Sequence, residues 1–279
     1  MDLTETNNFL SEFMKVTDLD SITPVEPGVG LKVGVDLGTS SIVLVVLDNN
    51  NNPILGLVEE AKVVRDGLVV NFMEAVQIVR RLKNLAEEVL ERELTAASTA
   101  VPPGTYNKNQ EIFANVLESA DFEVLSIVDE PIAAAALLNI KNGHIVDLGG
   151  GTTGVATISN GEIIQVFDEP TGGTHMSLVL AGYYNIGVDE AEKIKRDSNK
   201  ANDVFPIIRP VIEKMVSISI QAINRTNKLD LPVFIVGGAS KIKGFKGVFD
   251  NGITTDVYQS DHSEWITPIG IAMLMGEGD

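Results

Sequence analysis

The chain has no cysteine among its 279 residues and only three histidines. Without cysteine it can form neither disulfides, nor thiol nucleophiles, nor metal sites with thiolate ligands. The histidines, His144, His175 and His262, show no spacing that is typical of a zinc site. The sequence therefore gives no basis for a disulfide framework or for a metal held by cysteine or histidine.

Basic residues are scarce as well. Lysine and arginine together number 21 against 39 aspartates and glutamates, so the formal net charge is −18. A surface with this charge repels nucleic acids and anionic membranes, and we expect neither as a partner. A local anion site made of backbone N–H groups remains compatible with the negative total.

Long hydrophobic runs are also missing. The longest strongly apolar stretch, Ile132–Leu138, is far too short to span a bilayer. The first residues lack the charged and then apolar pattern of a secretory signal. With 44% hydrophobic residues the chain can nevertheless bury a core. We expect a cytoplasmic protein with one large domain or two ordinary ones.

The sequence does contain one strand–turn–strand pattern twice. It reads "VGVDLGTSSIVLVVLD" from Val33 to Asp48 and "HIVDLGGGTTGVATIS" from His144 to Ser159. In both copies an aspartate ends an apolar run, a short Gly/Thr/Ser turn follows, and a second apolar run begins. A third apolar run follows each copy, which predicts strands at about 32–36, 41–47, 53–60, 144–147, 152–158 and 162–168. The duplication predicts two similar lobes.

The chemistry of these turns suits a phosphate group. Glycines let the backbone approach a ligand closely, and successive N–H groups form a cradle for anions. The aspartates Asp36 and Asp147 would repel a bare phosphate, but they suit a hydrated Mg²⁺ placed between carboxylate and phosphate. One copy alone would pass for an ordinary hairpin turn. Two copies in the same strand context favour a polyphosphate site.

A dinucleotide fingerprint is the rival interpretation. Gly149, Gly151 and Gly154 spell G-x-G-x-x-G. That fingerprint requires a helix directly after the turn, so that the helix N-terminus meets the pyrophosphate. Here the following "TTGVATIS" alternates and is rich in β-branched residues, which predicts a strand. The sequence therefore disfavours a nicotinamide or flavin site.

Five segments resemble, in the same order, the signatures of the actin-like ATPase superfamily, which includes actin, sugar kinases, DnaK-type chaperones and MreB. The two phosphate loops are "DLGTSS" at 36–41 and "DLGGGTTG" at 147–154. The two connecting helices are "VDEPIAAAALL" at 128–138 and "TPIGIAMLM" at 267–275, and the adenosine motif is "FIVGGASKIKGF" at 234–245. The resemblance implies an α/β fold with two ribonuclease H-like lobes and a nucleotide cleft between them.

The expected domains follow from this resemblance. Lobe I covers residues 30–142 with a C-terminal helix at 266–279, and lobe II covers 143–265 with an adenine-side helical subdomain at about 173–230. Residues 1–29 form an N-terminal extension. The segments "VVRDGLVVNF" at 63–72 and "VLESADFEVLSIVDEP" at 116–131 most closely resemble the EutJ family of ethanolamine utilisation.

The resemblance also implies site residues and cofactors. ATP or ADP with Mg²⁺ is the expected cofactor. Asp36 and Asp147 would hold the metal, and Asp147 with Glu130, which positions or deprotonates water, would be catalytic. The nucleotide would be bound by Gly38, Thr39, Ser40, Gly149, Gly150, Gly151, Thr152, Gly172, Gly173, Glu192, Lys195, Arg196, Gly237, Gly238, Ser240 and Lys241.

One departure from the family pattern concerns the metal. The chaperones carry a second aspartate at the end of the second phosphate loop, where this chain has Gly154. The glycine removes one carboxylate from the expected metal shell. It leaves open whether the protein hydrolyses ATP.

The implied function is an ATP-binding, DnaK-like chaperone or reactivation factor. Its expected client is a protein, such as ethanolamine ammonia-lyase or a component of the bacterial microcompartment. Hydrolysis, if present, would be weak and Mg-dependent. The alternatives are a non-hydrolysing nucleotide-binding scaffold, an MreB-like filament protein, which the net charge of −18 disfavours, and a sugar kinase.

The N-terminal extension carries an apolar stripe. Phe9, Leu10, Phe13 and Met14 recur at helical spacing, which predicts a short amphipathic helix. Pro24, Pro27, Gly28 and Gly30 follow it as a linker. The helix could dock on a partner protein, or it could fold back and cover the chain's own lobe.

Overall fold

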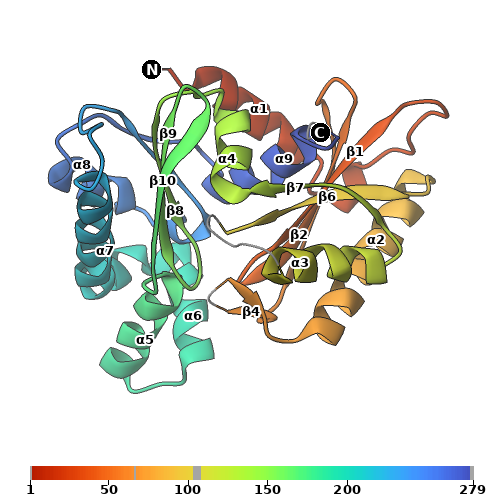
Figure 1. The fold of residues 1–279 in the computed structure, drawn as a ribbon. Helices are drawn as coiled ribbons and strands as arrows, with labels where there is room; N and C mark the ends of the chain where they lie inside the picture. Colours follow the sequence, from red (N-terminus) through yellow and green to blue (C-terminus); the bar gives the residue numbers. More distant parts are fainter. Residues whose placement is uncertain (1, 66, 103–107, 277–279) are drawn as a thin grey trace. The chain divides into compact units, whose positions relative to one another are not determined.

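The computed structural model describes residues 2–65, 67–102 and 108–276 (Figure 1). The chain packs into two compact units, Met1–Asn139 with Trp265–Asp279, and Ile140–Glu264. A mixed five-stranded sheet lies at the centre of each unit. Both units thus have the predicted α/β character.

The first unit's sheet has the strand order β3-β2-β1-β6-β7. The first three strands pair antiparallel as a meander, whereas β6 and β7 continue the sheet parallel to β1. A separate short ladder joins β4 and β5. The bounds are β1 Leu31–Leu37, β2 Ser41–Asp48, β3 Pro53–Glu60, β4 Val64–Arg65, β5 Leu68–Val69, β6 Ala96–Val101 and β7 Glu123–Asp129.

The second unit repeats this plan. Its sheet has the order β10-β9-β8-β11-β12, with an antiparallel meander followed by two parallel strands. The repeated sequence pattern therefore forms the same meander at the same place in each sheet. The bounds are β8 Gly143–Leu148, β9 Thr153–Ser159, β10 Glu162–Glu169, β11 Val233–Val236 and β12 Val257–Gln259.

Helices cover the sheets because their apolar faces match the buried strand faces. In the first unit, α2 buries residues from Ala75 to Leu90 against the sheet. Asn71 caps this helix by accepting a hydrogen bond from the backbone N–H of Glu74. The helices of this unit are α1 Thr4–Lys15, α2 Phe72–Leu90, α3 Lys108–Ser119, α4 Glu130–Leu138 and α9 Ile266–Met273.

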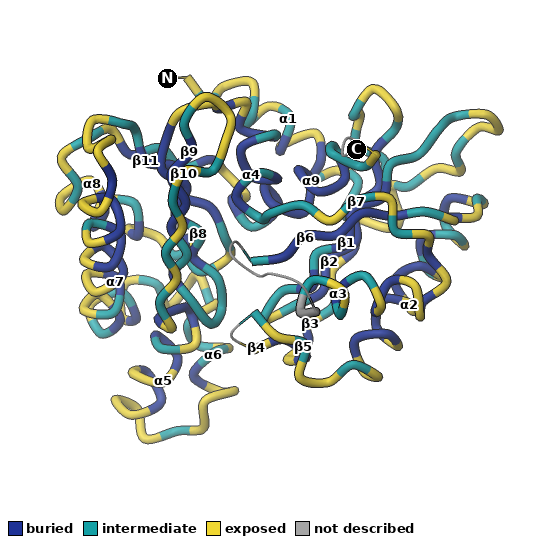
Figure 2. Tube along the Cα trace, in the orientation of Figure 1, coloured by how far each residue is buried: buried dark blue, intermediate teal, exposed yellow. Residues whose placement is uncertain are grey.

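The second unit carries its helices between β10 and β12. The longest of them, α7, contributes Ile208, Ile212 and Met215 to the core, together with Val146 and Leu148 of β8. Along α7, Figure 2 shows buried residues alternating with exposed ones. The bounds are α5 Gly173–Tyr184, α6 Val188–Arg196, α7 Ala201–Ile223 and α8 Phe245–Gly252.

The two helices expected to connect the lobes, α4 and α9, pack closely on each other within the first unit. A Cβ placed on Gly270 of α9 would lie 1.8 Å from the carbonyl oxygen of Ala133 in α4. A Cβ on Gly34 of β1 would lie 2.5 Å from the backbone nitrogen of Ala272. Glycine at both positions therefore allows α9 to contact α4 and the sheet directly.

The apolar stripe of the N-terminal segment is buried in the first unit. Leu10 and Phe13 are fully buried, and α1 packs on β3. A Cβ on Gly56 of β3 would lie 2.7 Å from the Phe13 ring. Of the two alternatives, the structure favours the one in which this helix folds back on its own lobe. In the part of the chain that is described, no helix is long and apolar enough to cross a membrane.

Candidate functional site

The second glycine-rich turn lies between β8 and β9. The backbone N–H of Gly149 donates to the carbonyl of Thr152 at 3.2 Å and closes the turn. By contrast, the N–H groups of Gly150, Gly151 and Thr152 have no acceptor among the described residues. All three residues are partly exposed. Successive N–H groups without acceptors form a cradle that suits an anion such as phosphate.

The N-terminus of α5 holds this turn in place. The N–H of Gly173 donates to the Gly149 carbonyl at 2.9 Å, and the N–H of Thr174 donates to the Gly150 carbonyl at 2.8 Å. These bonds draw the turn carbonyls toward α5. They satisfy two N–H groups that a helix start would otherwise leave unpaired.

Gly172 allows this contact because it has no side chain. A Cβ at Gly172 would lie 2.6 Å from the Gly151 carbonyl carbon and 2.7 Å from the Thr152 nitrogen. Both distances are shorter than real Cβ contacts, so any larger residue would displace the turn. The predicted residues Gly149–Thr152, Gly172 and Gly173 are thereby brought together.

The segment after β11, predicted as the adenosine motif, contacts the end of β8. Gly237 has φ +91°, and a Cβ on it would lie 2.4 Å from Oδ1 of Asp147. Both the backbone conformation and the lack of space therefore require glycine at this position. Ser240 donates to the carbonyl of Gly237 at 2.7 Å. Lys241 pairs with Glu264 at 2.6 Å, while the second carboxylate oxygen of Glu264 is buried without a described partner. Gly238 lies beside Glu264.

The residues predicted on the adenine side, on α6, bind one another and the start of α5. Lys195 Nζ donates to the Gly173 carbonyl at 2.9 Å, to Ser177 Oγ at 2.9 Å and to Glu192 at 2.6 Å. Ser177 also donates to Glu192, and Arg196 pairs with Glu192 at 2.7 Å. The structure thus gives Glu192 and Lys195 a role in fixing the turn at Gly173, while the Arg196 side chain stays half exposed.

This cluster shifts two ionisations. Burial would raise the pKa of Glu192, but Lys195, Ser177 and Arg196 hold it down to about 2. Burial lowers the pKa of Lys195, and Glu192 opposes that shift. Glu192 is therefore ionised at neutral pH and forms a partly buried ion pair with Lys195, which needs its hydrogen bonds to offset the loss of hydration.

Asp147, predicted to hold the metal, lies at the end of β8. Burial and the nearby charge of Asp168 raise its pKa to about 6. Asp168, Ser177 and Glu264 were not among the predicted site residues. Asp168 is brought to the site by the pairing of β10 with β9, and Ser177 by the contact between α5 and α6. Neither residue belongs to a motif that the sequence alone could reveal.

The first unit holds the other set of predicted residues. Asp36 lies in β1, and the turn that follows is closed by a bond from the Gly38 N–H to the Ser41 carbonyl at 3.0 Å. Thr39 is partly exposed and Ser40 exposed. Glu130 is the first residue of α4 and half-buried. Burial raises the pKa of its neighbour Asp129.

The carboxylates fit a hydrated magnesium ion better than a metal enclosed by protein. Among the described residues, no group of three histidines, aspartates or glutamates could hold a metal. Mg²⁺ usually takes one or two protein carboxylates and completes its shell with water and phosphate oxygens. Asp147 beside an N–H cradle matches that donor set.

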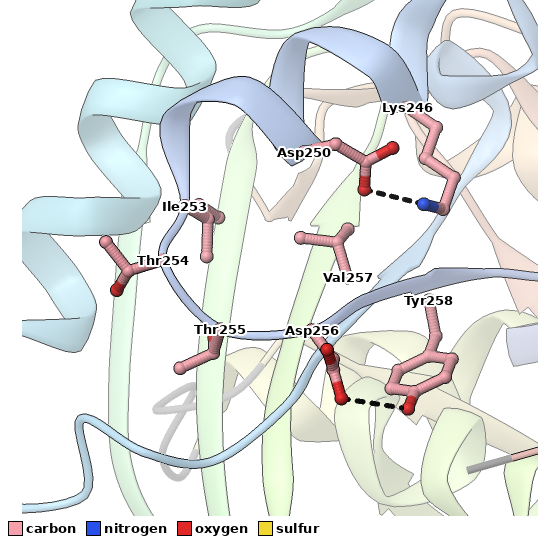
Figure 3. A pocket seen from close by; sticks show the side chains of 8 residues that line it. All are labelled: Lys246, Asp250, Ile253, Thr254, Thr255, Asp256, Val257 and Tyr258. Carbon is pink, nitrogen blue, oxygen red and sulfur yellow. Dashed lines mark hydrogen bonds and ion pairs between the residues drawn. The ribbon is translucent and has the colours of Figure 1, made fainter.

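A separate hollow of about 410 Å³ lies at α8 and β12 (Figure 3). Lys246, Asp250 and residues 253–258 line it, and Lys246 pairs with Asp250 there at 2.6 Å. It includes none of the predicted site residues. Its open, polar lining gives no reason to place the nucleotide there.

Comparison with known proteins identifies the relatives of this chain. The family described as MreB/Mbl protein matches residues 54–203. The chain is 40% identical over 259 residues to the ethanolamine utilization protein EutJ of Salmonella typhimurium, a match that covers 92% of this chain and 90% of that protein.

Solved structures agree with this result. The crystal structure of EutJ from Carboxydothermus hydrogenoformans is 44% identical, with a TM-score of 0.91, and covers 98% of this chain and 99% of its own. MreB5 of Spiroplasma citri bound to ADP has a TM-score of 0.69 at 18% identity, covering 88% and 96% of the two chains. The predicted actin-like ATPase fold is thus confirmed. The chain belongs to the EutJ family of ethanolamine utilization proteins.

Proposed function

We propose that the protein binds an adenine nucleotide with Mg²⁺ and serves ethanolamine utilisation as a DnaK-like chaperone or reactivation factor. The main support for this proposal is the cradle of Gly150, Gly151 and Thr152, whose N–H groups have no acceptor among the described residues. Two hydrogen bonds from α5 hold that cradle in shape. A preformed set of donors binds a phosphate without the cost of ordering a loop.

The chain's own residues divide the work in this proposal. The cradle and the Thr152 hydroxyl bind phosphate, Asp147 holds the metal side, and Gly237–Lys241 with Arg196 contact the adenosine. The first unit carries groups of the same kind in Asp36, Thr39 and Ser40. Bound Mg²⁺ would neutralise phosphate charge, since phosphoryl transfer depends mainly on positioning and electrostatics.

The client belongs to the proposal as well. The relatives are named for ethanolamine utilization, which points to ethanolamine ammonia-lyase or a microcompartment protein as the partner. A nucleotide-dependent change in affinity for one of these proteins is the expected behaviour. Co-purification of the full chain with ammonia-lyase, with ATP and with ADP, measures it. Equal recovery with both nucleotides would argue against a switch.

A non-hydrolysing scaffold is the second candidate. Gly154 favours it, because the position where the chaperones carry a carboxylate has no side chain in this protein. Such a scaffold would bind Mg-ATP and keep it intact. Phosphate release by the purified protein separates the two candidates.

Isothermal titration with Mg-ATP, Mg-ADP and NADH tests the nucleotide site itself. We expect the adenine nucleotides to bind and NADH to give no heat of binding. Gly172→Ala should weaken ATP binding at least about tenfold, because its Cβ would push into the Gly150–Thr152 turn.

Gly182→Ala is the matched control. It lies on the same helix, α5, and its Cβ would meet nothing within 4 Å. It should bind ATP like the wild type. NADH binding without a response to ATP, or equal ATP affinity in both glycine variants, would contradict the proposed site.

A further inference from the structure

Three positions on neighbouring strands of the second unit form one row across the sheet. Gly154 of β9 pairs with Asp147 of β8 on one side and with Asp168 of β10 on the other. Directly opposite residues in antiparallel strands place their side chains on the same face of the sheet. The row therefore has a carboxylate at each end and no side chain in the middle.

The carboxylate of Asp168 on the neighbouring strand lies close to the space that a side chain at position 154 would fill. A Cβ built on Gly154 would lie 3.5 Å from Oδ1 of Asp168 and 4.0 Å from Cβ of Asp147. The carboxylate of Asp168 thus reaches over the glycine toward the strand that carries Asp147. The two aspartates are close enough to interact electrostatically. An aspartate at position 154 would instead crowd three carboxylates into this row.

Like charges that lie close together repel one another, and a bound dication would offset that repulsion. A hydrated dication fits the pair, since Mg²⁺ in nucleotide sites is usually held by one or two carboxylates together with water and phosphate.

We propose that Asp168 supplies the second carboxylate of the Mg²⁺ shell on the second unit, in place of the side chain that Gly154 lacks. The carboxylate has moved from the middle strand to the edge strand of the same meander, at the same point along the sheet. This inference rests on the proposed nucleotide function. It implies that Gly154 alone is no argument against metal-dependent chemistry.

The experiment compares ADP affinity with Mg²⁺ and with EDTA by isothermal titration, in the full chain. The wild type should bind ADP more tightly with Mg²⁺. Asp168→Asn should reduce that gain at least about tenfold, the usual loss when a group beside a metal is removed. Its affinity in EDTA should equal or exceed that of the wild type, because one negative charge near the phosphates is gone. Retained binding in EDTA also shows that the variant is folded.

Two further variants sharpen the result. Glu162→Gln removes the same charge at the far end of β10 and should leave the Mg²⁺ gain unchanged. The double variant Gly154→Asp with Asp168→Asn returns a carboxylate to the middle strand and should recover much of the gain. If Asp168→Asn does not fold, Asp168→Ser takes its place.

The outcomes distinguish the role of Asp168 in the Mg²⁺ shell from the existence of the nucleotide site. A Mg²⁺ gain in Asp168→Asn within twofold of the wild type overturns the role of Asp168 and leaves the nucleotide site standing. A loss in Glu162→Gln as large as in Asp168→Asn overturns it too, because the effect would then be general charge. A wild type that binds no ADP in either buffer refutes the proposed function and this inference with it.

Discussion

The rings of Phe13 and Trp265 lie in contact, with centroids 5.1 Å apart and planes tilted by 54°. Phe13 belongs to α1 near the start of the chain, whereas Trp265 directly precedes α9 near its end. Both residues are buried in the first unit. The contact joins the N-terminal segment to the helix that packs on α4 and β1, so this segment forms part of the core.

Phe13→Ala should therefore destabilise the protein strongly. Removing a buried phenyl ring costs about 3–5 kcal/mol through lost burial and the cavity that remains. The free energy of unfolding in urea measures the loss. Leu19→Ala is the control, because Leu19 is 40% exposed and its removal should cost little. Deletion of residues 1–28 should lower the melting temperature markedly, and an unchanged melting temperature would show that α1 is a dispensable docking element.

The cluster of Glu192, Lys195 and Ser177 should matter for stability because it is partly buried. In Glu192→Gln, the Lys195 ammonium loses its charge partner while its side chain is only 9% exposed. The loss should approach, but not reach, the ~3–5 kcal/mol found when a fully buried pair is broken, since Glu192 is 30% exposed. Urea unfolding measures it.

The exposed pair of Arg209 and Glu213 provides the control for that measurement. It has the same i,i+4 spacing as Arg196 and Glu192, but both side chains are more than half exposed. Glu213→Gln should cost only about 0.3–0.5 kcal/mol. Equal losses in the two variants would show that the Lys195 cluster contributes no more than a surface ion pair.

His144 should make stability depend on pH. The ring is fully buried, with Nε2 bonded to the Lys228 carbonyl and Nδ1 to the Thr157 hydroxyl, both at 2.9 Å. Because a carbonyl only accepts, Nε2 carries the proton and Nδ1 accepts from Thr157. Burial lowers the pKa of His144, although the Lys228 bond and the charge of Asp230 oppose the shift.

A lowered pKa means that the unfolded chain takes up the proton first as the pH falls. The stability that neutral His144 provides is thus complete above its ordinary pKa and declines below about 6.5. The difference in unfolding free energy between the wild type and His144→Gln should be largest at pH 7.5 and smaller at pH 5. A constant difference would contradict the assigned neutral state.

The sequence predicted the two meanders well because they depend on local alternation and turn residues. The predicted strands 53–60 and 162–168 correspond to β3 Pro53–Glu60 and β10 Glu162–Glu169. The short β4–β5 ladder escaped prediction, since strands of two residues carry too little periodicity.

The site was predictable only where the chain signals it locally. Gly172 and Gly237 are constrained by the close approach of neighbouring atoms, and such constraints leave a readable glycine in the sequence. Asp168 and Ser177 are placed by strand pairing and helix packing, which no spacing in the sequence encodes. Their roles could emerge only from the folded structure.

The last prediction concerns Glu130. It is half-buried at the start of α4, where an acidic residue is also favourable for the helix itself. If Glu130 positions the attacking water, Glu130→Gln should lower phosphate release from ATP by about 10²–10⁴-fold. ATP affinity should remain within about twofold, because the side chain would contact water and not phosphate. Single-turnover assays measure the rate of phosphate release, and isothermal titration measures the ATP affinity.

Glu123→Gln provides the comparison, because Glu123 is exposed at the opposite end of β7, the strand that leads into Glu130. It should hydrolyse ATP like the wild type. Normal turnover in Glu130→Gln would reduce Glu130 to a helix-start residue. If the wild type binds ATP but releases no phosphate, the non-hydrolysing scaffold is the better description, and the nucleotide then acts by occupancy alone.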